Sequence, residues 1–227
     1  MMMDTLPETS NCRTICEILE KMYPQAASEL HFSNPFECLI ATMLSAQCTD
    51  QRVNMITRNL FKEIKAPEDV AVLSPEQLEK KISSCNYYKT KSRHIFKACQ
   101  ILVEEHRGMI PDSRDSLMKL PGVGRKTANV VVSNAFGKPA IAVDTHVFRV
   151  ANRLGLTSAA DVLNTEIQLM ERIPEEKWSA AHHWLILHGR RVCDARKPAC
   201  DSCQLAQHCA YYLINMDEPC RSVEGSQ

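Results

Sequence analysis

The 227-residue sequence lacks the features that mark several large classes of protein. No apolar run approaches the roughly 20 residues that a membrane-spanning helix needs. The first residues show neither the basic segment nor the apolar core of a secretory signal. Strand-like alternation, tandem repeats and low-complexity tracts are also absent. The sequence therefore predicts a globular, cytoplasmic or nucleoid-associated protein of bacterial type, with no membrane partner.

An excess of charge of either sign is missing too, because 27 Lys and Arg balance 27 Asp and Glu. A zero net charge argues weakly against nucleic acid, but the distribution of the charge matters more. Residues 113–153 carry seven Lys or Arg against two Asp or Glu, whereas residues 1–30 carry two against five. One segment thus has the sign that a phosphate backbone attracts.

Cysteine is abundant, and the odd number of 11 in a chain without an export signal argues against a disulfide framework. Four of these residues crowd near the C-terminus in the spacing Cys193-x6-Cys200-x2-Cys203-x5-Cys209. Four soft thiolates in so short a span suit either zinc or an iron–sulfur cluster, and the spacing leaves both open. Most of the others lie at apolar helical positions, which is typical of reduced small hydrophobes.

Apolar residues recur every three or four positions in several stretches, which predicts amphipathic or buried helices. The clearest stretches are 12–22, 36–46, 53–61, 95–103 and 147–154. Asn34 before Pro35 and Ser74 before Pro75 are typical helix starts, with a capping side chain followed by proline at the first helical position. The sequence therefore predicts an all-α fold.

A tight glycine turn at residues 120–124 joins two of these helical patterns. Gly122 and Gly124 can adopt positive φ and let another molecule's backbone approach closely. The first amides of the helix that follows have no partner within that helix, and they lie at the positive end of its dipole. Such a helix start binds anions, so Lys126 stands beside a predicted phosphate site.

A chain-length estimate pairs this lysine with a carboxylate. Residues 126–136 form about 15 Å of helix, and the extended link 137–143 can span up to roughly 23 Å. If the link runs back along the helix, Asp144 returns to the level of Lys126, so that both face one cleft. The helix start, and partial burial, would favour the neutral, nucleophilic amine. The alternatives are a solvated lysine that touches phosphate and an aspartate that only caps a helix.

Two polar corners between helices are further candidates for contact with nucleic acid. One carries Gln47, and the other carries Tyr87 among asparagine and lysine residues. An aromatic ring at a loop tip can stack on bases or wedge into a duplex. The alternatives are an exposed glutamine in a capped corner and a tyrosine that packs on its own domain.

Together, residues 120–130 (LPGVGRKTANV), residues 141–150 (IAVDTHVFRV) and the four-cysteine spacing resemble the endonuclease III family. These are DNA repair enzymes of the helix-hairpin-helix glycosylase superfamily. The resemblance covers nearly the whole chain, from residues 34–37 (NPFE) to residues 182–190 (HHWLILHGR), and the motifs are highly specific in combination.

The resemblance implies two helical domains with the active cleft between them. The implied divisions are a six-helix barrel at 28–138 with the helix-hairpin-helix at about 113–136, an iron–sulfur cluster domain at 1–27 plus 139–212, and a C-terminal tail at 213–227. It also implies that the four cysteines hold a [4Fe–4S] cluster. A monovalent cation, K⁺ or Na⁺, would bind the backbone carbonyls of Met118, Leu120 and Val123.

The implied reaction is base excision repair of double-stranded DNA that contains oxidised pyrimidines or abasic sites. The damaged base is flipped out of the duplex, because its C1′ cannot be reached in the stack. Lys126 attacks C1′, the base leaves, and the resulting Schiff base cuts the strand on the 3′ side by β-elimination. Asp144 stabilises the positive charge and assists proton transfer. The enzyme is expected to be a monomeric, bifunctional DNA glycosylase and abasic-site lyase.

The resemblance also implies a set of DNA contacts. They are Gln47, Tyr87, Gly122, Val123, Gly124, Arg125, Thr145 and His146. Gln47 would fill the gap left by the flipped nucleotide. The wedge on the opposite strand is commonly a leucine in this family, whereas this chain has Tyr87 there, so opposite-base preference is expected to differ.

Two other functions remain open from the sequence. One is a related adenine-DNA glycosylase, although that family lacks a lysine at the position of Lys126 and has an extra C-terminal domain. The other is a DNA-binding module with a structural metal and no chemistry.

Overall fold

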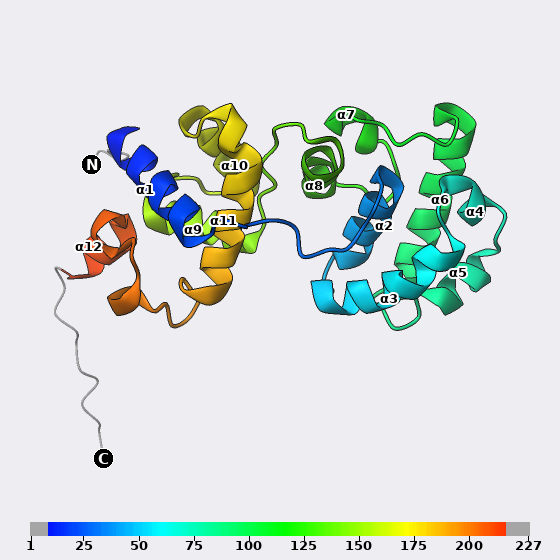
Figure 1. The fold of residues 1–227 in the computed structure, drawn as a ribbon, viewed down its shortest axis with the longest axis horizontal. Coiled ribbons are helices and arrows are strands. Elements are labelled where there is room, and N and C mark those ends of the chain that lie inside the picture. Colours follow the sequence, from blue (N-terminus) through cyan, green and yellow to red (C-terminus); the bar gives the residue numbers. More distant parts are fainter. Residues whose placement is uncertain (1–8, 217–227) are drawn as a thin grey trace, which may run out of the picture. The chain divides into compact units, whose positions relative to one another are not determined.

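The prediction of an all-α fold is confirmed. The computed structural model describes residues 9–216, and this part contains twelve α-helices, three short 3₁₀ helices and no strand (Figure 1). The chain divides into two compact units, one of residues 27–142 and one of residues 1–26 with 143–227. No helix within residues 9–216 is both long and apolar enough to cross a membrane.

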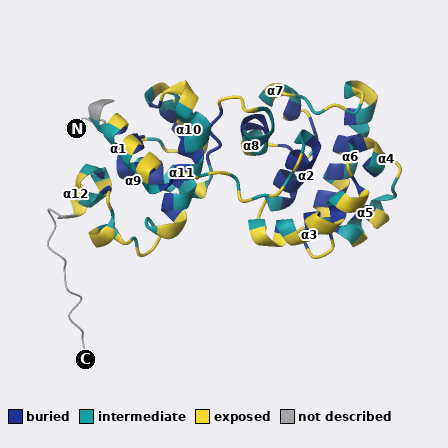
Figure 2. Cartoon of the chain, in the orientation of Figure 1, coloured by how far each residue is buried: buried dark blue, intermediate teal, exposed yellow. Residues whose placement is uncertain are grey.

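The unit of residues 27–142 is built around one buried helix. Its helices are α2 (Pro35–Ser45), α3 (Asp50–Glu63), α4 (Pro67–Ala71), α5 (Pro75–Lys81), α6 (Tyr88–His106), α7 (Arg114–Leu117) and α8 (Arg125–Phe136). In α2 every residue from 36 to 44 is buried, as its nearly continuous apolar run predicts (Figure 2). This helix packs against α3, α6 and α8, so the hairpin that precedes α8 rests on the core of the unit.

The two predicted proline-containing helix starts are confirmed, and their caps explain why the helices begin there. Asn34 Oδ1 accepts a 2.9 Å hydrogen bond from the Glu37 amide at the start of α2. At the start of α5, Ser74 and Gln77 form a reciprocal capping box, with bonds of 3.3 and 2.7 Å. Each such cap contributes about 1 kcal/mol, because it satisfies amides that the helix leaves without partners.

The second unit contains α1 (Thr9–Met22), α9 (Thr145–Leu154), α10 (Val162–Arg172), α11 (Trp178–Arg191) and α12 (Ala210–Met216). Helix α11 packs against both α9 and α1. A glycine in α11 allows its close approach to α9, because a Cβ at Gly189 would lie 3.0 Å from Val150 Cγ2. Two 3₁₀ turns, Cys200–Ser202 and Ala206–His208, lie in the cysteine-rich segment before α12.

Helix α12 runs to Met216, past residue 213, where the C-terminal tail was expected to begin. The rest of that expected tail, residues 217–227, lies outside the described residues, and so do residues 1–8.

Candidate functional site

The glycine turn before α8 has the geometry that the sequence predicts. The Val123 amide donates to the Leu120 carbonyl at 3.1 Å and closes the turn. Gly122 has a φ of +79°, and a Cβ on this residue would lie 2.7 Å from His94 Cβ in α6. The fold itself therefore requires glycine at position 122, both for its backbone angle and for space.

Gly124 differs from Gly122, because nothing in the described residues 9–216 requires a glycine there. Its φ is −87°, and a Cβ would meet no atom within 4 Å. It is the N-cap of α8, and no side chain caps this helix start. The start of α8 therefore has no side-chain cap and has open space at the Cβ position of Gly124, and an uncapped helix start of this kind binds anions.

Lys126 lies in the first turn of α8 and is exposed. Arg125 beside it is half-buried, Val123 is buried, and the side chain of Met118 is exposed.

Asp144 is the N-cap of α9, and its carboxylate is firmly held. Its Oδ1 accepts two 2.8 Å hydrogen bonds, from the amides of His146 and Val147. The capping role is thus confirmed, and it fixes the direction of the carboxylate. Thr145 in the same turn is exposed, and His146 is half-buried. Arg149 Nη2 lies 3.2 Å from His146 Nδ1 and can only donate, so the ring proton of a neutral His146 is on Nε2.

The two polar corners, predicted separately, come together in the unit of residues 27–142. The Asn86 side-chain amide donates to the Gln47 carbonyl at 2.9 Å. Gln47 and Tyr87 line one cavity of about 360 Å³, together with His94 and Gly122. The turn of the hairpin thus borders the same cavity as both corners.

Both corner residues have left-handed backbones, with a φ of 52° at Gln47 and 57° at Tyr87. Such a conformation costs a non-glycine residue about 1–2 kcal/mol and persists where the surroundings enforce it, often at functional sites. Tyr87 is 67% exposed, so the alternative of a ring packed into its own domain is not found.

One residue of this corner was missed by the sequence analysis. Lys91 is buried, and its ammonium group donates to the Leu44 carbonyl at 2.7 Å and to Cys85 Sγ at 3.2 Å. A cation there neutralises the negative end of α2, just before the Gln47 corner. In the sequence, Lys91 is one of several lysines in a polar loop, and no pattern sets it apart.

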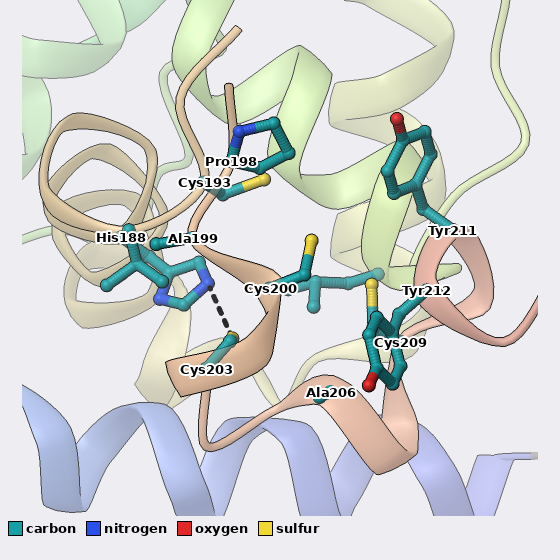
Figure 3. A pocket seen from close by; sticks show the side chains of 12 residues that line it. His188, Cys193, Pro198, Ala199, Cys200, Cys203, Ala206, Cys209, Tyr211 and Tyr212 are labelled. Atoms are coloured by element: carbon teal, nitrogen blue, oxygen red, sulfur yellow. Dashed lines mark hydrogen bonds between the residues drawn. The ribbon is translucent and has the colours of Figure 1, made fainter. Parts of the chain in front are cut away.

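The four C-terminal cysteines line one pocket, as Figure 3 shows. Within residues 9–216, no three His, Cys, Asp or Glu side chains converge as the ligands of a single metal ion do. Burial is the main cause that raises the pKa of the Cys200, Cys203 and Cys209 thiols. Thiolates at these positions therefore need compensating positive charge, which a bound metal supplies.

Two arginines of α9, one turn apart, hold the segment that begins at Cys193. Arg149 donates to the Cys193 carbonyl through Nε and Nη2, at 3.2 and 3.0 Å. Arg153 Nη1 lies 3.4 Å from Cys193 Sγ and 2.7 Å from the Asp194 carbonyl. Part of the charge of the basic segment 113–153 is therefore hydrogen-bonded within the protein. Sequence spacing alone could not separate these arginines from DNA-binding ones.

Comparison with known proteins identifies the class. Residues 40–175 match the profile of the HhH-GPD superfamily of base excision DNA repair proteins. Endonuclease III of Bacillus subtilis (strain 168) is 51% identical over 189 residues, which cover 83% of this chain and 86% of that protein. Endonuclease III of Escherichia coli (strain K12) is 47% identical over 193 residues, or 85% and 92% of the two chains.

A solved structure of a trapped covalent intermediate between endonuclease III and DNA, an estranged-adenine complex, is also similar. It has a TM-score of 0.87 and 49% identity, and the match covers 92% of this chain and 99% of that one. The chain therefore belongs to the endonuclease III family within the HhH-GPD superfamily. It is a base excision repair enzyme that acts on DNA, a DNA glycosylase with abasic-site lyase activity.

Proposed function

We propose that Lys126 is the nucleophile with which the chain removes oxidised pyrimidines from duplex DNA and then cuts the abasic site. The observation that carries this assignment is the start of α8. Gly124 is the N-cap of this helix, it offers no side-chain cap, and the space around its Cβ position is open. A DNA phosphate seated there would bring the adjoining sugar to the first turn of α8, where Lys126 lies.

The proposed reaction balances in two stages. The neutral amine of Lys126 adds to C1′, and the bond from C1′ to the base breaks, so that the base leaves with the electron pair and takes up a proton. Opening of the sugar gives a Schiff base on the lysine nitrogen. Loss of a proton from C2′ then expels the 3′ phosphate by β-elimination, and water hydrolyses the Schiff base.

In this proposal Asp144 supplies negative charge near C1′. The bond to the base breaks with positive charge building up on the sugar, and a nearby carboxylate lowers the energy of that state. Its two amide hydrogen bonds at the start of α9 hold the carboxylate in place throughout the reaction. Gln47 and Tyr87, on neighbouring corners of one cavity, would enter the duplex where the nucleotide has left it.

We further propose that residues 28–138 are the barrel domain and that residues 1–27 with 139–212 are the cluster domain. Cys193, Cys200, Cys203 and Cys209 would hold a [4Fe–4S] cluster, which ties the last segment of that domain together. The residues fit this group, because four thiols line one pocket and soft ligands suit iron and sulfide. A cation at Met118, Leu120 and Val123 stays a prediction, and the Leu120 carbonyl there already accepts the Val123 amide. We expect the enzyme to act on chromosomal DNA in the bacterial nucleoid.

Borohydride trapping on DNA with an abasic site tests the nucleophile. The wild-type protein should form a reduced covalent adduct, and Lys126→Ala should form none. Lys119→Ala is the matched control, because Lys119 is another exposed lysine of the hairpin, and this variant should still be trapped. An adduct that survives in Lys126→Ala would refute the assignment. No adduct in the wild type would refute the proposed lysine Schiff base altogether.

A further inference from the structure

A buried chain of hydrogen bonds leads from the end of α1 to one of the four cysteines. The Tyr23 hydroxyl lies 3.1 Å from His188 Nδ1. On the other side of the ring, His188 Nε2 lies 3.7 Å from Cys203 Sγ, the contact that is dashed in Figure 3. Both rings are out of solvent, with Tyr23 6% exposed and His188 1% exposed. Neither Tyr23 nor His188 takes part in the proposed reaction at the DNA, so this series of hydrogen bonds needs another explanation.

The chemistry of the partners fixes where the protons lie once Cys203 is a metal-bound thiolate. A thiolate has no proton and can only accept, so His188 Nε2 must carry the proton that points to Cys203. In a neutral imidazole the other nitrogen, Nδ1, is then an acceptor. The Tyr23 hydroxyl therefore donates to Nδ1, and both hydrogen bonds run in one direction, from Tyr23 to His188 to Cys203.

His188 also contacts a second cysteine through its main chain. Its carbonyl accepts from the Cys193 amide at 2.8 Å, where α11 ends. The imidazole and the peptide group of one residue thus join two of the four candidate ligands. Because Tyr23 fixes the ring from the other side, the N–H group toward Cys203 is held in a single orientation.

Hydrogen bonds to cysteine sulfur are one of the factors that set the reduction potential of an iron–sulfur cluster. Reduction adds one electron, which increases the negative charge on the sulfurs. An N–H donor stabilises that added charge more than it stabilises the oxidised state. The donor therefore raises the potential, and a low-dielectric surrounding strengthens its effect.

We propose that His188, oriented by Tyr23, is a positioning residue that donates to Cys203 and raises the reduction potential of the bound cluster. This inference rests on the proposed [4Fe–4S] assignment. It concerns electron transfer to and from the cluster and assigns no role to His188 in cleavage of DNA.

Protein-film voltammetry of the purified holoprotein tests it, with the electrode as the source of the single electron. His188→Leu should lower the reduction potential of the cluster by about 59 mV, which for one electron corresponds to a tenfold change in the equilibrium between the reduced and oxidised cluster. His188→Gln, whose side-chain amide can still donate, should recover part of that shift. Tyr23→Phe should shift the potential in the same direction by a smaller amount. Tyr88→Phe is the matched control, a half-buried tyrosine of the other unit, and should leave the potential unchanged.

Iron and sulfide analysis of the wild type comes first and separates two kinds of failure. A wild type with zinc, or without a cluster, refutes the proposed cofactor. A loaded wild type whose potential equals that of a loaded His188→Leu overturns the role of His188. If His188→Leu does not take up the cluster, Tyr23→Phe decides, and an unchanged potential in that variant overturns the proposal.

Discussion

Helices α8 and α9 begin in opposite ways. Helix α8 starts at Gly124 without a side-chain cap. In contrast, the Asp144 side chain caps the start of α9 by accepting two 2.8 Å hydrogen bonds from backbone amides. The first carries the proposed nucleophile, Lys126, and the second carries the proposed charge-stabilising group. An open helix start keeps its amides for a ligand, while a closed one uses its amides to fix a side chain.

This difference matches what each start would have to do. A phosphate of the DNA backbone can serve as the cap of α8 only if the protein leaves that place empty. A carboxylate that stabilises a developing positive charge has to be in position before the reaction begins. Substitutions at these helix starts should therefore affect stability and activity differently.

Asp144→Asn should separate the helix-capping role of Asp144 from the effect of its negative charge on the reaction. The asparagine side-chain oxygen can accept the same two hydrogen bonds from the backbone amides, so the free energy of unfolding should change by less than about 0.5 kcal/mol. Removal of bases should slow by about a hundredfold to a thousandfold, because the stabilising charge is lost. Single-turnover release of a damaged base, alongside urea denaturation, measures both effects. Asp144→Ala should lose the activity and also about 1 kcal/mol of stability. Full activity in Asp144→Asn would leave Asp144 with only its structural role.

Gly122→Ala tests whether the turn before α8 requires a glycine, both for its backbone angle and for space. A methyl group would lie 2.7 Å from His94 Cβ, on a backbone with a φ of +79°. Strain and overpacking together should destabilise the protein by about 2–4 kcal/mol. Gly124→Ala is the same chemical change two residues on, and with no atom near its Cβ it should cost about 1 kcal/mol or less. Equal losses in urea denaturation would contradict the distinction between the two glycines.

Gly124→Asp makes the start of α8 resemble that of α9. The new carboxylate should cap the helix and leave thermal stability unchanged or slightly higher. It should also take the place of a phosphate at the start of α8 and repel it, so affinity for abasic-site DNA should fall about tenfold, or 1.4 kcal/mol. Gly124→Ser, which caps without a charge, should lie between this variant and the wild type in a fluorescence anisotropy titration. If both variants bind DNA like the wild type, the start of α8 is not a phosphate site.

The start of α6 differs from both, because its N-cap is Tyr87 in a left-handed conformation and no side chain caps the helix. Tyr87→Asn should raise the free energy of unfolding by about 0.5 kcal/mol, since asparagine tolerates this conformation better. The same variant should cut damaged duplexes several-fold more slowly, because it lacks the tyrosine ring that would enter the DNA duplex. Tyr87→Phe keeps the ring and should cut like the wild type. A loss of stability in Tyr87→Asn would show that the ring packs within the protein.

Much of this fold could be predicted because the signals are local. A cap such as Asn34 or Asp144 acts on amides two or three residues away, so its partners are already written in the sequence. The cysteine pattern is local in the same way, since its four members lie within 17 residues, and these residues line one pocket. The C-terminal helix α12 was the exception, because its last turn falls in a stretch expected to be a tail.

The helices, their caps, the hairpin with Lys126 and the family motifs could be predicted, because each of these depends on residues close together along the chain. Which of the remaining residues meet depends on how the helices pack. This packing brought Gln47, Tyr87 and Gly122 to one cavity, buried Lys91 beneath the Gln47 corner, and joined Tyr23 through His188 to Cys203. Those contacts span up to 165 positions between donor and acceptor, and only packing of the helices determines them.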